Sequence, residues 1–253
     1  MKFKKSLVLI CAICSLITNW NSTANAQNEK STSSINQSKE KMNNTTVYEI
    51  AIRQIKNNLE AFEKARTDFI HIWLSSEGVS GDREFKAFYN IPQNNQPVFV
   101  GMTEWDSQEA FYAASNQHGN SEKAKAFFSQ FDMLAFATLK PTEGDFELAT
   151  LGKDNGTIVE MAIRRVSTEK RTAFNTSRKR YIEALNAVPG VKGSFEFEVV
   201  MSGSGDNLTV GMTVYEDKAA FDNTNETVNQ SQIAKDYFST FEISTIQYVN
   251  SVK

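Results

Sequence analysis

The stretch Pro97-Val-Phe-Val-Gly-Met-Thr-Glu-Trp-Asp-Ser-Gln-Glu-Ala-Phe111 decides the fold. Its first half is apolar and β-branched, which is typical of a buried strand, and Asp106 or Ser107 can cap a helix after it. The pattern returns later in the chain as Asn207-Leu-Thr-Val-Gly-Met-Thr-Val-Tyr-Glu-Asp-Lys-Ala-Ala-Phe221. Self-similarity at a fixed spacing indicates a repeated structural unit. The sequence therefore predicts a tandem duplication.

Each copy is predicted to follow the order β-α-β-β-α-β. The first strand, Val47–Arg53 or Ile158–Arg164, alternates in polarity and is followed by apolar residues at helical spacing. Each first helix is expected to stop at a Gly-Val-x-Gly turn, with Gly78 and Gly190 at positive φ. Two further strands, a helical region and a last strand complete the unit. This order is the split βαβ, or ferredoxin-like, arrangement of the α+β class.

The predicted organisation has five parts. They are a signal peptide over residues 1–26, a flexible tether over 27–45, a first repeat over 46–140, a linker over 141–156 and a second repeat over 157–253. The tether is polar along most of its length, a composition that does not offset the entropy of ordering. The linker is rich in Gly, Glu and Asp.

Residues 1–26 have the pattern of a secretory signal. Three lysines precede the apolar run Leu7–Ile17, which is too short for a permanent membrane span, and Ala24-Asn-Ala26 matches a cleavage site. We therefore expect an exported protein, periplasmic or secreted, with no membrane contact after signal removal. Cys11 and Cys14 lie in this leader, so the mature chain is expected to lack disulfides and cysteine metal ligands.

The charge balance argues against a nucleic-acid partner. The full chain has 27 Lys and Arg against 30 Asp and Glu, a net charge of −3. Removing three leader lysines leaves 24 against 30, or −6. The two histidines have no partner at metal-ligand spacing, and the chain shows no phosphate loop or dinucleotide fingerprint. Neither a metal nor a cofactor is expected.

The pattern resembles the dimeric α+β barrel superfamily, specifically its antibiotic-biosynthesis-monooxygenase-like (ABM) group. The resemblance rests on three motifs present in both copies: a Glu-x-Ala-Ile-Arg strand, the Gly-Val-x-Gly turn and the Gly-Met-Thr-x-Trp/Tyr run. It implies two facing sheets with helices outside, here within one chain as a monomeric pseudo-dimer or in a higher homo-oligomer. It also implies a small organic ligand and, at most, cofactor-independent monooxygenation. Heme-degrading relatives carry Asn, Trp and His where this chain has Glu49, Ala114 and Ala124, so heme degradation is not expected.

Strand alternation predicts which side chains point into the barrel. The apolar set that includes Ile50 and Ile52 is expected to face the helices, so the opposite set should line the lumen. Its members are Glu49, Arg53, Phe99, Thr103, Trp105, Glu160, Arg164, Thr213 and Tyr215. A few polar groups in an apolar cavity suit a small molecule, an arginine could hold a carboxylate or phenolate, and a buried glutamate could act as a general base.

Two alternatives stay open at this point. Glu49–Arg53 and Glu160–Arg164 can equally be structural ion pairs along their strands. The protein can equally be a non-catalytic exported module that binds another protein. The copies are identical at these charged positions, which favours structure, but they differ at Trp105 and Tyr215, which leaves catalysis open.

Overall fold

The computed structural model describes residues 46–56, 58–143 and 146–252. The expected signal peptide and tether lie outside these residues. Within the described part, no helix combines the length and apolar character that a membrane crossing requires.

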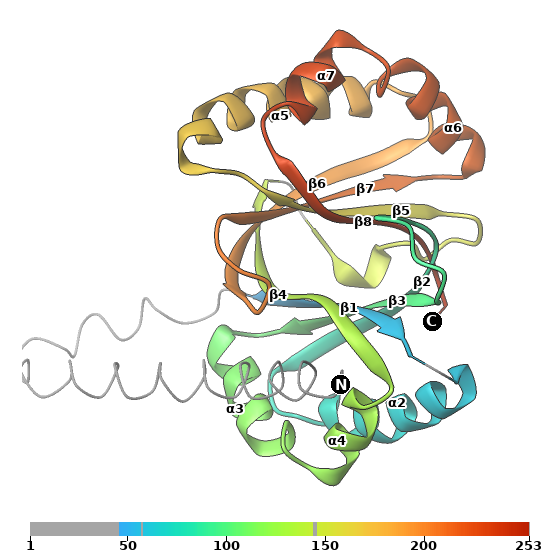
Figure 1. The fold of residues 1–253 in the computed structure, drawn as a ribbon, viewed down its shortest axis with the longest axis vertical. Helices are drawn as coiled ribbons and strands as arrows, with labels where there is room; N and C mark the ends of the chain where they lie inside the picture. The colour runs from blue at the N-terminus through green and yellow to red at the C-terminus, as the bar shows by residue number, and fades with distance from the viewer. Residues whose placement is uncertain (1–45, 57, 144–145, 253) are drawn as a thin grey trace, which may run out of the picture.

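The fold is mixed α+β, with two halves that follow each other along the chain (Figure 1). The first half consists of β1 Val47–Ile55, α2 Leu59–Trp73, β2 Val79–Ile91, β3 Val98–Trp105, α3 Gln108–His118, α4 Glu122–Phe128 and β4 Phe131–Glu143. The second consists of β5 Ile158–Arg165, α5 Arg171–Asn186, β6 Val191–Ser202, β7 Leu208–Tyr215, α6 Lys218–Thr227, α7 Gln232–Phe238 and β8 Glu242–Ser251. Short 3₁₀ turns, η3 Leu148–Thr150 and η4 Thr168–Lys170, precede and follow β5.

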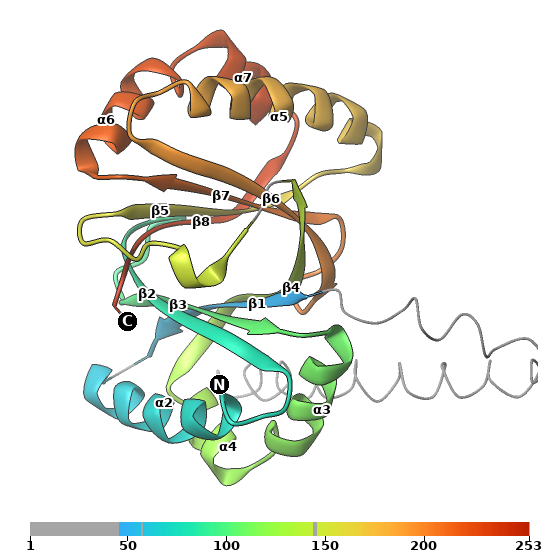
Figure 2. The ribbon, with the colours of Figure 1, turned by 180° about the vertical axis from the view of Figure 1, so that it is seen from behind.

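The eight strands form one closed antiparallel barrel in the order β1-β3-β2-β8-β5-β7-β6-β4. The halves join where β2 pairs with β8 and where β4 pairs with β6. Helices α2, α3 and α4 cover one side of the barrel, and α5, α6 and α7 cover the opposite side (Figures 1 and 2). The predicted α+β class and the predicted barrel are confirmed. Closing the sheet leaves no unpaired strand edge between the halves.

The barrel interior is an apolar core in which aliphatic side chains predominate. One cluster joins side chains of both halves, among them Ile50, Ile52, Val100, Met161 and Val210. The prediction that these residues face the helices is wrong. Alternation identifies which residues share a face but does not say which face is innermost, because both faces of this sheet are buried. The more uniformly apolar face lies inside.

The connection between the halves belongs to this core. Strand β4 runs on to Glu143, and Phe146, Leu148 and Leu151 pack in the interior cluster. The Tyr48 hydroxyl donates a hydrogen bond of 3.2 Å to the Phe146 carbonyl. The short yellow-green turn between the two sheets in Figures 1 and 2 is this segment. The polar composition of the predicted linker therefore concealed a buried segment.

The two recurring motifs of the sequence touch each other. Gly78 and Gly190 adopt positive φ, 84° and 85°, as predicted, although they lie in the turns before β2 and β6 rather than directly at the helix ends. A Cβ on Gly78 would lie 2.6 Å from Cβ of Ala110, and one on Gly190 would lie 2.6 Å from Cβ of Ala220. The turn and the start of the next helix pack so closely that a side chain does not fit.

Replacing Gly78 by alanine should lower the free energy of unfolding by about 1–3 kcal/mol, because it adds a clash to an unfavourable positive φ. Urea denaturation measures this change. The matched control is Gly81→Ala, whose Cβ would have Glu104 as its nearest neighbour at an ordinary 3.8 Å. Equal losses from the two substitutions would contradict the close-packing explanation.

Candidate functional site

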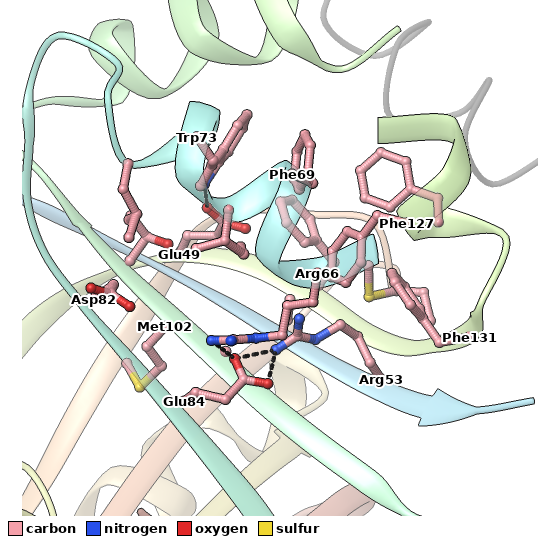
Figure 3. A pocket seen from close by; sticks show the side chains of 18 of the residues that line it. Glu49, Arg53, Arg66, Phe69, Trp73, Asp82, Glu84, Met102, Phe127 and Phe131 are labelled. Carbon is pink, nitrogen blue, oxygen red and sulfur yellow. Dashed lines mark hydrogen bonds and ion pairs between the residues drawn. The ribbon is translucent and has the colours of Figure 1, made fainter. Parts of the chain in front are cut away.

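A cavity of about 340 Å³ lies between helices α2, α3 and α4 and the outer face of the first sheet. Aromatic side chains form much of its wall, among them Phe69, Trp73, Phe111, Phe127 and Phe131. Figure 3 shows Glu49, Arg53 and Glu84 on the sheet, and Arg66 reaching toward Glu84 from α2 beside the aromatic rings. The volume falls within the range of about 300–1,000 Å³ typical of small-molecule sites.

Glu49 on β1 is an acid of raised pKa in this wall. It shares the face of β1 with Ala51 and Arg53, because side chains two residues apart point the same way. Trp73, at the end of α2, donates an indole hydrogen bond of 3.2 Å to Glu49 Oε2. Burial raises the Glu49 pKa from 4.5 to about 7, while the two nearby indoles, the Arg53 charge and the Thr103 hydroxyl oppose the rise. At neutral pH the carboxyl exchanges readily between its acid and base forms.

The raised pKa makes stability depend on pH. A folded pKa near 7 against 4.5 when unfolded means that the native state binds the proton more tightly, so stability falls as pH rises from 4.5 to 7. The loss is on the order of 3 kcal/mol. Glu49→Gln should therefore be more stable than wild type at pH 8 and about equally stable at pH 4.5. Chemical denaturation at both pH values measures the difference in the free energy of unfolding between variant and wild type. A difference that is the same at both pH values would disprove the raised pKa.

The second polar feature is a cluster of two arginines around one carboxylate. Arg53 Nη2 donates to both oxygens of Glu84, at 2.9 and 2.8 Å, and Arg66 Nη2 lies 3.1 Å from Glu84 Oε2. The Arg53 guanidinium also lies 5.6 Å from the ring centre of Phe127. Arg53 and Glu84 are almost fully buried, so the pairing offsets their desolvation.

The Gly-Met-Thr motif has a physical reason in this cluster. Arg53 on β1 reaches Glu84 on β2 across the intervening strand β3, where Gly101 opposes both Ala51 and Glu84. A Cβ on Gly101 would lie 2.4 Å from Arg53 Nη2. Because Gly101 has no side chain, the Arg53 guanidinium can pass over β3 and reach Glu84.

The second half repeats this arrangement around a cavity of about 260 Å³. Arg164 donates to Glu196 at 3.0 and 2.6 Å, and a Cβ on Gly211 would lie 2.8 Å from Arg164 Nη2. Glu160 on β5 occupies the position equivalent to that of Glu49 on β1, and burial also raises its pKa. Its Oε2 accepts a hydrogen bond of 2.9 Å from the Tyr215 hydroxyl. The two halves thus share the ion-pair cluster and differ in the environment of the glutamate.

A comparison with models of protein families finds no match, and a comparison with curated proteins finds none either. Solved structures do match. An anthrone oxidase-like protein aligns with a TM-score of 0.62 and 9% identity, over 82% of this chain and 92% of that chain. A candidate monooxygenase of Fusobacterium nucleatum aligns with a TM-score of 0.53 and 13% identity, over 83% and 94%. A mutant chlorite dismutase of Candidatus Nitrospira defluvii aligns with a TM-score of 0.51 and 9% identity, over 82% and 92%.

The chain has the fold of the dimeric α+β barrel superfamily. This agrees with the resemblance noted in its sequence motifs. At such low identity the likeness establishes the fold, and activity has to be argued from the residues themselves. Among the described residues, no group of three or more His, Cys, Asp and Glu side chains could hold a metal ion.

The predicted site residues lie outside the interior of the barrel. The predicted location in a shared lumen is wrong, because strand alternation does not say which face of the sheet lies inside the barrel. Glu49, Arg53 and Thr103 line the first cavity, and Glu160, Arg164 and Thr213 line the second. Trp105 and Tyr215 pack beside the two glutamates, and Phe99 packs on Phe62 with ring centres 5.2 Å apart. The residues are brought together within each half.

Sequence reasoning missed several residues that complete the sites. The expected same-strand pairs are replaced by pairs across strands, in which Arg53 meets Glu84 and Arg164 meets Glu196. A signal was available, since these glutamates, and also Arg66 and Arg178, recur at matching places in the two halves of the sequence. Trp73 gave no such signal, because Leu185 occupies the matching place.

Proposed function

We propose that the first cavity binds a small aromatic molecule with an acidic C–H or O–H group and that the protein oxygenates it with O₂, without a cofactor. One observation carries the proposal: the Glu49 carboxyl lies in the wall of a largely apolar cavity, with a pKa of about 7. A general base works best when its pKa is near the operating pH. The apolar wall would also exclude water from the reacting molecule.

The proposed reaction converts a methylene group that is activated by adjacent aromatic rings and a carbonyl. Glu49 removes one proton and leaves a delocalised carbanion, the same anion that the tautomeric phenol would give. The anion passes one electron to O₂, and the two radicals join through a C–O bond to form a peroxide, which takes up the proton. Loss of the second hydrogen from that carbon breaks the O–O bond. The balance is CH₂ + O₂ → C=O + H₂O, and no external reductant is consumed.

The geometry supports a defined role for each neighbour of Glu49. The Trp73 indole N–H holds one carboxylate oxygen and so fixes the carboxylate in the cavity wall. The Arg53–Glu84–Arg66 cluster carries two positive charges and one negative, so that its local field favours an anionic intermediate. The names of two structural neighbours, an anthrone oxidase-like protein and a candidate monooxygenase, support the reaction class.

We also infer that the barrel arose by duplication of one ferredoxin-like unit and is complete within a single exported chain. Glu49 pairs in register with Thr103, and Glu160 pairs in register with Thr213. Each half contains an arginine–glutamate pair that crosses a glycine. Mass spectrometry of exported protein should find Gln27 at its N-terminus, and light scattering should give the mass of a single chain.

Aerobic incubation with a panel of anthrones, phenols and quinols tests the activity. We expect O₂ uptake with at least one anthrone-type compound and formation of one carbonyl product per O₂. The absence of uptake with every compound would reject the oxygenase. If the same panel also left the melting temperature unchanged, small-molecule binding in the first cavity would be rejected as well, which would favour the non-catalytic module.

A further inference from the structure

The second cavity is built as a site of its own. It lies between α5, α7 and the outer face of the second sheet, and Ile91 at the end of β2 contributes to its wall from the other half. At about 260 Å³ it is slightly smaller than most ligand pockets, which favours a small, flat molecule. Its polar groups differ from those of the first cavity.

Three phenol side chains occupy positions that have no phenol in the first half. Tyr181 stands in place of Phe69, Tyr237 in place of Phe127 and Tyr248 in place of Thr138. The structure supports these equivalences. The stack of Phe69 on Phe127, with ring centres 5.3 Å apart, corresponds to the stack of Tyr181 on Tyr237 at 4.6 Å. Likewise, Glu49 pairs in register with Thr138, and Glu160 pairs in register with Tyr248.

Two of these hydroxyls can still donate a hydrogen bond. The Tyr181 hydroxyl is already used, since it donates to Asn229 Oδ1 at 2.6 Å. The Tyr237 hydroxyl accepts a hydrogen bond from Arg164, so its own hydrogen is available. The Tyr248 hydroxyl makes no hydrogen bond to any described residue. Burial raises the pKa of both Tyr237 and Tyr248, so both remain protonated donors at neutral pH.

The glutamate of this cavity has a different hydrogen-bond partner from Glu49. Tyr215 donates to Glu160 Oε2 at 2.9 Å, a shorter bond than the 3.2 Å indole contact of Glu49. Arg164 is committed to Glu196 and Tyr237, so it does not present a free cation to an anionic ligand. The remaining recognition elements are aromatic walls and two phenol donors.

We propose that the second cavity is a non-catalytic binding site for a small planar carbonyl compound of the quinone class. Its carbonyl oxygens accept hydrogen bonds from the Tyr237 and Tyr248 hydroxyls, and its ring lies against the aromatic wall. The assignment rests on the hydroxyl chemistry of this cavity, so it stands independently of the oxygenation proposed for the first.

Calorimetry combined with tryptophan fluorescence can separate the two cavities. The probe is 1,4-naphthoquinone, titrated into the full chain. Trp73 and Trp105 lie at the first cavity, and residues 157–253 contain no tryptophan. We expect calorimetry to detect binding at a site whose occupation by the quinone does not quench tryptophan fluorescence, the non-quenching site. Naphthalene, which has the same shape without carbonyls, should bind this site at least about tenfold more weakly, because two hydrogen bonds are lost.

Variants that restore first-half residues locate the site. Tyr237→Phe and Tyr248→Thr should each weaken the non-quenching site by roughly fivefold to tenfold and leave tryptophan quenching unchanged. Tyr181→Phe is the matched control, because its hydroxyl is already bonded to Asn229, and it should change the affinity by less than about twofold. The melting temperature of each variant checks folding. The proposal is overturned if the non-quenching site is not found, if naphthalene binds it as tightly as 1,4-naphthoquinone, or if folded Tyr237 and Tyr248 variants bind like wild type.

Discussion

Glu49→Gln should reduce aerobic turnover of an anthrone-type substrate by about 10²- to 10⁴-fold, the usual contribution of a positioned general base. The amide keeps the size of the side chain and can still accept from the Trp73 indole, but it does not take a proton from carbon at neutral pH. The loss should therefore appear in kcat, with KM changed much less. Oxygen-electrode rates over a range of substrate concentrations separate the two.

The pH profile gives an independent check on the same residue. Because Glu49 must be deprotonated to act, kcat/KM should rise about tenfold per pH unit below 7 and level off above it, with the inflection near the Glu49 pKa of about 7. The residual activity of Glu49→Gln should lack this inflection. A wild-type profile flat between pH 5 and 9 would rule out a base of this pKa.

Glu160→Gln is the comparison variant, because it makes the same change in the other half. The Tyr215 hydroxyl replaces the Trp73 indole as the partner of the glutamate there, and the proposal places the substrate in the first cavity alone. We expect less than about a threefold effect on turnover. Equal losses from Glu49→Gln and Glu160→Gln would show that the halves work together or alike, and would contradict a single reactive cavity.

The sequence predicted the barrel because local signals and the repeat agreed. The Gly-Met-Thr strand, the cap that follows it and the Gly-Val-x-Gly turn are each short-range patterns, and the structure places them as expected. Ser107 caps α3, and Asp217 caps α6. Gly78 adopts the positive φ that its position in the turn required.

Which face of each strand points into the barrel could not be predicted in the same way. Strand alternation correctly grouped Glu49 with Arg53, and Ile50 with Ile52, but a period of two contains no information on which group lies inside a closed barrel. Glu84 is remote from Arg53 in sequence. It becomes the partner of Arg53 only through the register of β1 on β3 and of β3 on β2, which no local pattern specifies. Trp73 reaches Glu49 only through the packing of α2 on the sheet.

Gly101→Ala should lower the free energy of unfolding by about 3–5 kcal/mol, comparable to breaking a buried ion pair. The new Cβ would lie 2.4 Å from Arg53 Nη2 and 3.2 Å from Glu84 Oε2, so the pair would have to separate or the strands would have to shift. Gly211→Ala repeats the experiment in the second half, where the Cβ would lie 2.8 Å from Arg164 Nη2. Urea denaturation, with the mild Gly81→Ala as reference, measures both.

A double-mutant cycle identifies the ion pair as the cause. Arg53→Leu removes the guanidinium that the new Cβ would meet, while Arg66 still neutralises Glu84 at 3.1 Å. In this background Gly101→Ala should cost at least about 1 kcal/mol less than in wild type, a coupling expected of groups in direct contact. Strictly additive effects would mean that strand geometry alone requires the glycine. A positive coupling at both Gly101 and Gly211 would explain why the Gly-Met-Thr motif occurs twice: each half needs the same gap for its arginine.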